Sequence, residues 1–487
     1  MGHICERPNP STLARMKETL EREIKLSPVE GFVLPELGGR RMPTRVFIST
    51  YHDSADLRLA RHQITFRHRV EDGAGVWQLK LPRDSARLEL ELGGPPARPP
   101  AELVDLLVAY LRGAPLVPVA RLRTRREVVL AQGAEIVDDS VAVLVGQRVS
   151  QRFREVEVEL IDGDEKALGR LAKELRKAGA HETQELQPKL YRVLGLNGTP
   201  TPPKLTKDTP PGEALGIALD ADYRALLTHD PGTRRGTDPE SLHQLRVAIR
   251  RLRAFLRAAR PLIDREWAES LREELGWLGG HLGPARDLDV MLERLRAEVT
   301  ALGDDAEAAA GLISGLEADR ADAYRDVAET LRGDRYLALL DRLEAAAEPP
   351  LSGEEKTLTK IFHREAKRMR QTFAELGDNP EDDALHASRI SVKRARYAAD
   401  LAAHELGKPG SKFVAVAKQL QDILGDHQDA VVAQERIKQW ADSAPTPESA
   451  FAAGRLVQLE RDRMAAARAA WPDTWERLDK AAREAVT

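Results

Sequence analysis

The 487-residue sequence holds a single cysteine, Cys5, so no disulfide framework can stabilise it and a reducing compartment is favoured. It has no apolar run of about 18 residues, so no membrane span is expected. Aromatic residues are only 5% of the chain, which leaves few rings on which unpaired nucleic-acid bases could stack. The pattern Gly-x4-Gly-Lys-Ser/Thr is missing too, which excludes a P-loop for holding nucleotide phosphates. These absences favour a cytoplasmic protein that contacts no membrane and for which nucleic acid is not the expected partner.

Charged residues, by contrast, make up 31% of the chain, although the net charge is only −4. Any binding of a polyanion must therefore come from local basic patches rather than from the overall field. The length predicts two or three domains. Residues 1–17 are expected to form a flexible extension, and the proline-rich segment 197–213 is expected to link a β-rich domain, 18–196, to an all-helical domain, 214–480.

Alternating segments of the first domain place charged side chains on one face and apolar side chains on the other. In EREIKL, Glu21, Glu23 and Lys25 share a face. Further segments align Arg67 with Arg69, Gln78 with Lys80, Arg87 with Glu89 and Glu91, Arg121 with Arg123 and Arg125, and Glu155 with Glu157 and Glu159. A solvated sheet face would explain one such strand. Across six strands, however, clustered acids repel one another unless a cation lies among them, so the pattern predicts a polar interior that binds a divalent metal ion and a phosphate-rich anion.

Residues 18–196 resemble the CYTH family of triphosphate tunnel metalloenzymes. The resemblance rests on Glu-x-Glu-x-Lys at 21–25, followed by YHDSADLRLARHQITFRHR, VWQLKLP, REVEVEL and QPKLYR. It implies an eight-stranded antiparallel β tunnel with flanking helices, and an activity on triphosphates that needs Mg²⁺ or Mn²⁺.

By position, the resemblance implies catalytic roles for Glu21, Glu23 and Lys25. It implies binding of substrate phosphates by Lys25, Arg67, Arg69, Lys80, Arg123, Arg125, Lys189 and Arg192. It implies metal ligation by Glu21, Glu23, Glu155, Glu157 and Glu159. Two departures from the family pattern are Ser54 in the turn that begins at Tyr51, and Pro188 before Lys189.

Inorganic triphosphate is the expected substrate, hydrolysed with the help of a divalent metal ion. Two alternatives remain open. One is an enzyme that uses the same tunnel on a nucleotide or on thiamine triphosphate, including an adenylate cyclase. The other is a protein without catalytic activity that binds polyphosphate through both domains.

The second domain contains two copies of a basic helix about 143 residues apart. The first copy aligns His243, Arg246, Arg250, Arg253 and Arg257 on one face, opposite Leu245, Ile249, Leu252, Phe255 and Leu256. The second copy aligns His386, Arg389, Lys393 and Arg396. Segments HLGPARDLDVML and ILGDHQDAVVAQ follow at matching distances, so the domain is expected to hold two pseudosymmetric halves, about 214–345 and 355–480. Because neither basic face is expected to have acidic partners, a phosphate-rich ligand is predicted there.

This second domain resembles the CHAD family, the conserved-histidine α-helical domains, through LHQLRVAIRRLR and LGPARDLDV. The resemblance implies a helical bundle that binds inorganic polyphosphate through its basic helices. Both halves of the chain would then act on condensed phosphates, which would also suit an association with polyphosphate granules.

Overall fold

The computed structural model describes residues 16–83, 86–162, 165–181, 188–196, 203–352, 357–377, 379–443 and 446–486, so residues 1–15 of the predicted extension lie outside the described residues. The chain divides into two compact units, residues 1–201 and 202–487. The first strand begins at Lys17, and the first helix of the second unit begins at Pro211, within the segment predicted to be the linker.

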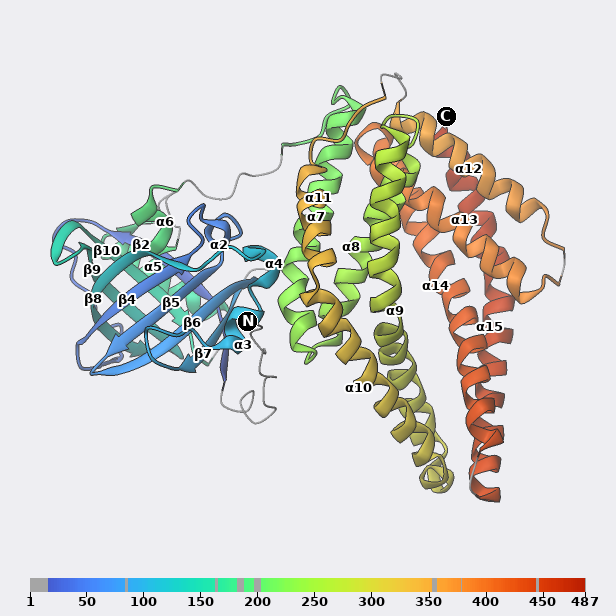
Figure 1. Cartoon of the computed structure of the whole chain (residues 1–487), viewed down its shortest axis with the longest axis horizontal. Helices are drawn as coiled ribbons and strands as arrows, with labels where there is room; N and C mark the ends of the chain where they lie inside the picture. The colour runs from blue at the N-terminus through green and yellow to red at the C-terminus, as the bar shows by residue number, and fades with distance from the viewer. Residues whose placement is uncertain are drawn as a thin grey trace, which may run out of the picture. The chain divides into compact units, whose positions relative to one another are not determined.

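The first unit is an antiparallel sheet whose strands close on themselves (Figure 1). The strands are β1 (Lys17–Glu21), β2 (Glu23–Pro28), β3 (Arg40–Arg41), β4 (Arg45–Asp53), β5 (Thr65–Glu71), β6 (Ala74–Arg83), β7 (Ala86–Gly93), β8 (Val117–Ala131), β9 (Ala134–Val145), β10 (Arg148–Leu160) and β11 (Ala180–His181). The main order is β1-β7-β6-β5-β4-β8-β9-β10-β2, with β3 paired to β8 and β11 to β2.

One chain segment closes the sheet. β1 pairs with β7, and β2 pairs with β10, yet only Arg22 separates β1 from β2. If this interrupted segment counts as one strand, the closed path contains eight, as the resemblance implied. The predicted charged face of EREIKL therefore spans the junction at which the tunnel closes.

Helices cover the apolar outer face of the tunnel. They are α2 (Arg58–Arg61), α3 (Ala101–Asp105), α4 (Val108–Leu111), α5 (Glu165–Lys177) and α6 (Lys189–Leu194). Leu171 and Leu175 of α5 pack in one cluster with Leu26, Val156 and Val158 of β2 and β10. The outward residues of these strands are thus buried, which leaves the inward face to the charged side chains.

The second unit is all helical. Its helices are α7 (Pro211–Arg235), α8 (Pro239–Ala258), α9 (Arg265–Ala301), α10 (Ala310–Arg332), α11 (Asp334–Ala345), α12 (Leu358–Ala374), α13 (Asp382–Leu401), α14 (Ala403–Asp442) and α15 (Pro447–Val486), with short 3₁₀ turns at Gly303–Asp305 and Glu307–Ala309. None of the described helices is both long and apolar enough to cross a membrane.

The helices repeat in order, as the sequence predicts. α7 packs on α8, α8 on α9 and α9 on α10, and the same contacts recur among α12, α13, α14 and α15. Figure 1 shows α9 with α10, and α14 with α15, as two long hairpins. The two basic helices, α8 and α13, contact each other, so the halves meet along the predicted basic faces.

The local sequence explains how α8 is placed. Asp238 accepts a hydrogen bond from the Glu240 amide and Pro239 occupies the first helical position, two features that favour a helix start. Along the helix, Leu245, Ile249 and the other predicted apolar residues are buried. The opposite face, which carries the arginines, remains accessible to a ligand.

Candidate functional site

The closed sheet encloses a cavity of about 260 Å³, the tunnel cavity, whose lining is almost entirely charged. Nine of the lining residues are cations: Lys17, Lys25, Arg45, Arg67, Arg69, Lys80, Arg87, Arg126 and Lys189. Seven are carboxylates: Glu21, Glu23, Glu89, Glu91, Glu135, Glu157 and Glu159. The lining therefore has two more positive than negative side chains.

Three adjacent strands, β5, β4 and β8, form a wall of arginines. Arg67 and Arg69 come from β5, Arg45 from β4 and Arg126 from β8. The Arg67 Nε donates to the amide oxygen of Gln78 at 2.7 Å, a neutral partner that leaves the positive charge available to an anion. Burial and the nearby Arg67 charge hold the pKa of Arg69 below its ordinary value, although Glu71, 3.6 Å away, opposes the shift.

The carboxylates gather on the other strands of the tunnel, β9, β10, β2, β1 and β7. Glu159 of β10 is directly opposite Glu23 of β2 and also directly opposite Glu135 of β9. Like charges at directly opposite positions destabilise a sheet. Burial, together with the charge of nearby Glu21, raises the pKa of the Glu159 carboxyl to about 7. Within this row Glu23 lies 3.2 Å from the Lys25 Nζ, whereas Glu159 and Glu135 form no ion pair within 4.0 Å among the described residues, so these two most need a further cation.

Two lysines neutralise the deeper carboxylates. The Lys189 Nζ lies 2.8 Å from Glu157, 3.0 Å from Glu155 and 3.1 Å from Asp139. The Lys25 Nζ lies 2.6 Å from Glu157. Burial alone would raise the pKa of the Glu157 carboxyl, but the charges of Lys189 and Lys25 hold it well below its ordinary value. Lys189 thus joins three strongly buried acids, from β9 and β10, to the helix α6.

The chemistry of the donors fits a hard divalent cation. Among the described residues, no three acidic or histidine side chains already converge as ligands. Glu23, Glu159 and Glu135 nevertheless offer carboxylate oxygens from three neighbouring strands, which is the donor type that Mg²⁺ and Mn²⁺ take. Glu21 lies beside this row, although Lys80 donates to it at 2.6 Å. A cation among these acids would offset their mutual repulsion.

The structure corrects the predicted orientation of side chains on β8. Arg123 and Arg125 are exposed and do not line the tunnel cavity, whereas Arg126 does. Residues directly opposite on neighbouring antiparallel strands share a face. Arg126 is opposite Arg45, which faces inward, while Arg123 is opposite Ile48. RLRTRR contains arginines of both parities, so only the register with β4 decides which set faces the ligand.

Two further predictions need correction. Arg192 is exposed, and its guanidinium lies over the ring of Phe153 at 4.6 Å rather than in the cavity, because α6 directs only Lys189, in its first turn, into the tunnel. Glu155, predicted as a metal ligand, is buried behind the lining and is paired with Lys189. The remaining predicted residues of the tunnel line the cavity together. Sequence reasoning missed Glu135, which only its register opposite Glu159 reveals.

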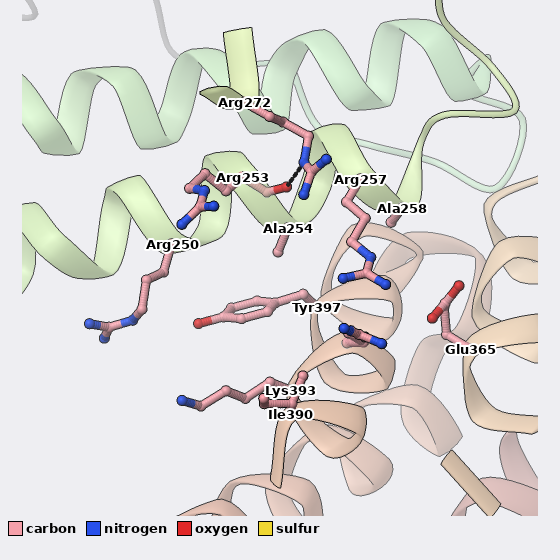
Figure 2. A pocket seen from close by; sticks show the side chains of 11 residues that line it. Arg250, Arg253, Ala254, Arg257, Ala258, Arg272, Glu365, Ile390, Lys393 and Tyr397 are labelled. Carbon is pink, nitrogen blue, oxygen red and sulfur yellow. Dashed lines mark hydrogen bonds between the residues drawn. The ribbon is translucent and has the colours of Figure 1, made fainter. Parts of the chain in front are cut away.

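A second charged site lies between the two halves of the helical unit. The residues of the basic groove are His243, Arg246, Arg250, Arg253 and Arg257 of α8, and His386, Arg389, Lys393 and Arg396 of α13. Part of it is a pocket of about 220 Å³ (Figure 2). Arg250, Arg253, Arg257 and Lys393 line this pocket, as do Arg272 and Arg394, Glu365, Tyr397 and three apolar residues, Ala254, Ala258 and Ile390. Arg272 and Arg394 were not predicted, because they belong to another helix and to the other edge of α13.

The pKa of Lys393 shows that few acidic side chains neutralise the cations of the basic groove. Burial, together with the charges of Arg389, Arg250 and Arg396, lowers the pKa of Lys393 to about 8, although Asp429 opposes the shift. A lysine this far below its ordinary value lies among cations that lack enough acidic partners. The groove is therefore suited to bind an anion with several negative charges.

The glycine of each repeated Leu-Gly segment lies beside an arginine of the basic groove. A β-carbon added at Gly425 would lie 3.3 Å from an Arg389 guanidinium nitrogen, and one at Gly283 would lie 3.8 Å from Arg246. The absent side chain at Gly425 therefore lets Arg389 lie close to the next helix, whereas the distance at Gly283 is an ordinary van der Waals contact. Arg246 also donates to the carbonyl oxygen of Gly283 at 2.7 Å.

The expectation that the basic faces lack acidic partners is wrong at Arg246. Its guanidinium donates to Asp287 at 3.0 Å, an acid supplied by α9 and not by α8. Asp287 and Asp429 occupy equivalent positions in the two repeated segments. The aspartates of the second motif thus lie near arginines of the first, which helical spacing within one segment could not show.

Comparison with known families matches residues 19–187 to the CYTH domain and residues 217–438 to the CHAD domain. Two proteins of Mycobacterium tuberculosis, from strain CDC 1551 / Oshkosh and strain ATCC 25618 / H37Rv, are each 32% identical over 98% of this chain and 99% of their own, and both are named uncharacterized. The chain therefore belongs to a family in which a CYTH domain is followed by a CHAD domain.

Three solved structures each match part of the chain. PptA from Streptomyces chartreusis is 25% identical over 55% of this chain and 100% of its own, with a TM-score of 0.48. The CHAD domain from the plant Ricinus communis is 25% identical over 58% of this chain and 95% of its own, with a TM-score of 0.45. A putative adenylyl cyclase from Hippeastrum, described as having a dominant triphosphatase activity, is 17% identical over 37% of this chain and 97% of its own, with a TM-score of 0.27.

Removing the Lys189 charge should destabilise the tunnel. Lys189→Met leaves three buried acids without a shared cation, so we expect the free energy of unfolding to fall by about 3–5 kcal/mol. Arg192→Met, on the exposed side of the same helix, should change it by less than about 1 kcal/mol. Chemical denaturation of both variants measures the difference, and equal losses would contradict the assigned role of Lys189.

Removing a carboxylate from the glutamate row should separate metal binding from folding. We expect Mn²⁺ to stabilise the wild-type tunnel, by about 2.7 kcal/mol at a hundredfold excess over its dissociation constant. Glu159→Gln should lose most of this gain, yet be no less stable without metal, because repulsion is relieved. Glu165→Gln, on the exposed surface of α5, is the control. Thermal unfolding with and without Mn²⁺ tests this, and an undiminished shift in Glu159→Gln would exclude the row as the metal site.

Proposed function

We propose that the tunnel hydrolyses inorganic triphosphate with a divalent metal ion, and that the helical unit binds inorganic polyphosphate. One observation supports the first part most strongly. The cavity has an arginine wall on β5, β4 and β8 and a carboxylate wall on β9, β10, β2, β1 and β7. Such a pair of walls suits a phosphate chain on one side and the metal ion that neutralises it on the other.

The size and lining of the cavity favour inorganic triphosphate over a nucleotide. Its volume of about 260 Å³ lies below the roughly 300–1,000 Å³ of pockets that take drug-sized molecules. Tyr51 is the one aromatic residue among the described side chains that line it. A purine or a thiamine ring would therefore find little apolar surface, whereas a compact polyanion would find arginines on one wall and metal-binding carboxylates on the other.

The reaction would depend on alignment and charge more than on covalent chemistry. Arg67, Arg69 and Arg126 would hold phosphate oxygens, since guanidinium groups match them in a bidentate way. Glu23, Glu159 and Glu135 would hold the metal, with Glu21 beside them. When bound, Mg²⁺ or Mn²⁺ supplies a Lewis acid for the phosphate and lowers the pKa of an attacking water.

The lysines would complete the site. Lys25 and Lys189 fix Glu157 and thereby the position of β10 relative to β2 and α6. Lys80, now paired with Glu21, would be available to a phosphate oxygen if Glu21 held the metal. These residues would position the reacting groups and neutralise the charge of the leaving phosphate.

Polyphosphate binding is proposed for the basic groove because its cations exceed its acids. The lining of the pocket in Figure 2 contains six cations and one carboxylate, Glu365. A linear chain of phosphates could follow α8 and α13, with contacts that grow in number with chain length and weaken as salt rises. Contact with polyphosphate granules in the cytoplasm would expose the protein to both proposed ligands, triphosphate and polyphosphate.

Phosphate release from tripolyphosphate, ATP and thiamine triphosphate with Mg²⁺ or Mn²⁺ tests the tunnel. Tripolyphosphate should be turned over fastest. Arg67→Gln should lower kcat/KM by about a hundredfold or more, since the charge it supplies in a closed site is lost. Arg125→Gln, on the outer face, should stay within about twofold of the wild type.

Three results would change this assignment. Faster turnover of ATP or thiamine triphosphate would replace the substrate, and cyclic AMP with pyrophosphate as products would make the enzyme a cyclase. Binding of tripolyphosphate without any turnover would support a protein that only binds condensed phosphates.

Binding of polyphosphate should depend on pH through Lys393. Its pKa of about 8 in the free protein should rise toward the ordinary value of a lysine, about 10.5, when an anion binds. Because the charged lysine binds better, affinity should fall above pH 8, by up to about tenfold per pH unit until the pKa of the complex is reached. The ligand keeps its charge there, since the second pKa of a phosphate is about 6.

The Lys393→Arg variant is the matched test, because arginine keeps its charge over this range. Its affinity, measured by titration calorimetry between pH 7 and pH 10, should stay nearly level. An equal fall in wild type and variant would show that another group controls the pH dependence.

A further inference from the structure

The two halves of the helical unit are not equivalent at the basic groove. An offset of 143 residues relates Arg250 to Lys393, and these two cations lie close together where α8 meets α13. The same offset relates Asp222 to Glu365, Arg251 to Arg394 and Arg257 to Asp400. If the halves were equivalent, each contact on one side would have a counterpart on the other.

On one side the charges are neutralised within the protein. The Arg251 Nε donates to both oxygens of Asp222, at 2.8 and 3.1 Å, and Arg251 lies 3.9 Å from Asp400. Asp222 is buried. One arginine is therefore held between two carboxylates, so this cluster has no excess of positive charge for an anionic ligand.

On the other side the same positions leave an excess of cations. Arg394 stands in place of Arg251, but Arg257 takes the place of the second carboxylate, Asp400. The remaining acid, Glu365, accepts instead from Arg368 of its own helix, at 2.8 Å. Among the described residues, neither Arg257 nor Arg394 forms an ion pair within 4.0 Å.

The excess is concentrated at one end of the pocket. Arg257 lies on the same side of the Tyr397 ring as Glu365, whereas Arg250, Lys393 and the Tyr397 hydroxyl point to the opposite side (Figure 2). Burial and the charge of Arg394 hold the pKa of Arg257 below its ordinary value. Arg272 of α9 adds a further cation to the same pocket.

Carboxylates border this end. Glu365 lines the pocket, and Glu269 is paired with Arg272 and with Arg260 just beyond the last turn of α8. Those two arginines neutralise Glu269, but further phosphates of a continuing chain would meet Glu365, the one carboxylate among the described residues that line the pocket. The cation-rich end therefore favours an anion that stops there rather than one that passes through.

We infer that this end of the pocket, at Arg257, Arg394 and Glu365, binds the terminal phosphate of a polyphosphate chain, so that the groove binds chains by an end. The inference rests on the proposed binding of polyphosphate by the helical unit. The two ends of the groove would therefore bind different parts of the chain, because the equivalent cluster around Arg251 offers no such subsite.

The chemistry of a chain end matches the subsite. An internal phosphate has one ionisable oxygen, whereas a terminal phosphate has two, the second with a pKa of about 6. The additional charge suits two guanidinium groups that lack partners. When protonated, the terminal group can donate to Glu365, whereas an internal phosphate has only acceptor oxygens near neutral pH and would be repelled.

Binding of linear polyphosphate of one chain length, with free ends or with both ends capped, tests this in the full-length protein. Capping converts each terminal phosphate to a phosphoramidate of a neutral amine, which removes one ionisable oxygen per end. The wild type should bind free-ended chains about tenfold more tightly, since at least one charge-assisted hydrogen bond is lost on capping. Arg257→Gln and Arg394→Gln should bind both ligands alike, at the affinity of the capped chain.

Arg396→Gln is the matched control, because Arg396 belongs to the basic groove but not to this pocket. It should weaken binding of free-ended and capped chains by the same factor. Thermal unfolding verifies that each variant remains folded.

Equal affinity of the wild type for free-ended and capped chains would overturn the chain-end subsite and leave polyphosphate binding intact. The chain-end subsite would also be overturned if folded Arg257→Gln and Arg394→Gln kept the full preference for free-ended chains. Failure of the wild type to bind either chain would overturn the proposed function of the helical unit and this inference with it.

Discussion

The charged side chains that face into the tunnel need partners of opposite charge, and most of the first unit depends on how those partners are arranged. Moving ions out of water costs several kcal/mol each unless partners compensate. Lys189 supplies such a partner for Asp139, Glu155 and Glu157 at once. It begins α6, and that helix packs on the end of the tunnel through Leu190. A single ammonium group thus ties two strands and a helix into one charged interior.

The buried charges around Lys189 are balanced, but the charges elsewhere in the cavity are not. Glu23, Glu159 and Glu135 lie side by side across three strands. On the opposite wall Arg45 and Arg126 are paired with acids, but among the described residues Arg67 donates only to the neutral Gln78 and Tyr51. The two imbalances have opposite signs and lie on different walls. A metal ion and a phosphate chain bound together would correct both imbalances.

The helical unit handles charge differently. Its two halves share a plan, but exchange of one residue type, arginine at 257 for aspartate at the equivalent position 400, leaves one side neutralised and the other cationic. The pseudosymmetric packing of the two halves therefore forms the groove. The loss of symmetry at positions 257 and 400 makes the two ends of the groove differ in charge. An open groove between α8 and α13 also suits a long ligand, whereas the closed tunnel suits a short one.

The sequence by itself determined the two units, the alternation in EREIKL and the repeated basic helices, because these depend on periods of two and 3.6 residues within one segment. It could not determine which arginines of RLRTRR face inward, because both parities carry charge and only pairing with β4 selects Arg126. Glu135 and Arg394 became visible for the same reason: their neighbours Glu159 and Arg257 lie on another strand and another helix. Local periodicity records which side chains share a face, but contacts between segments distant in sequence decide what that face meets.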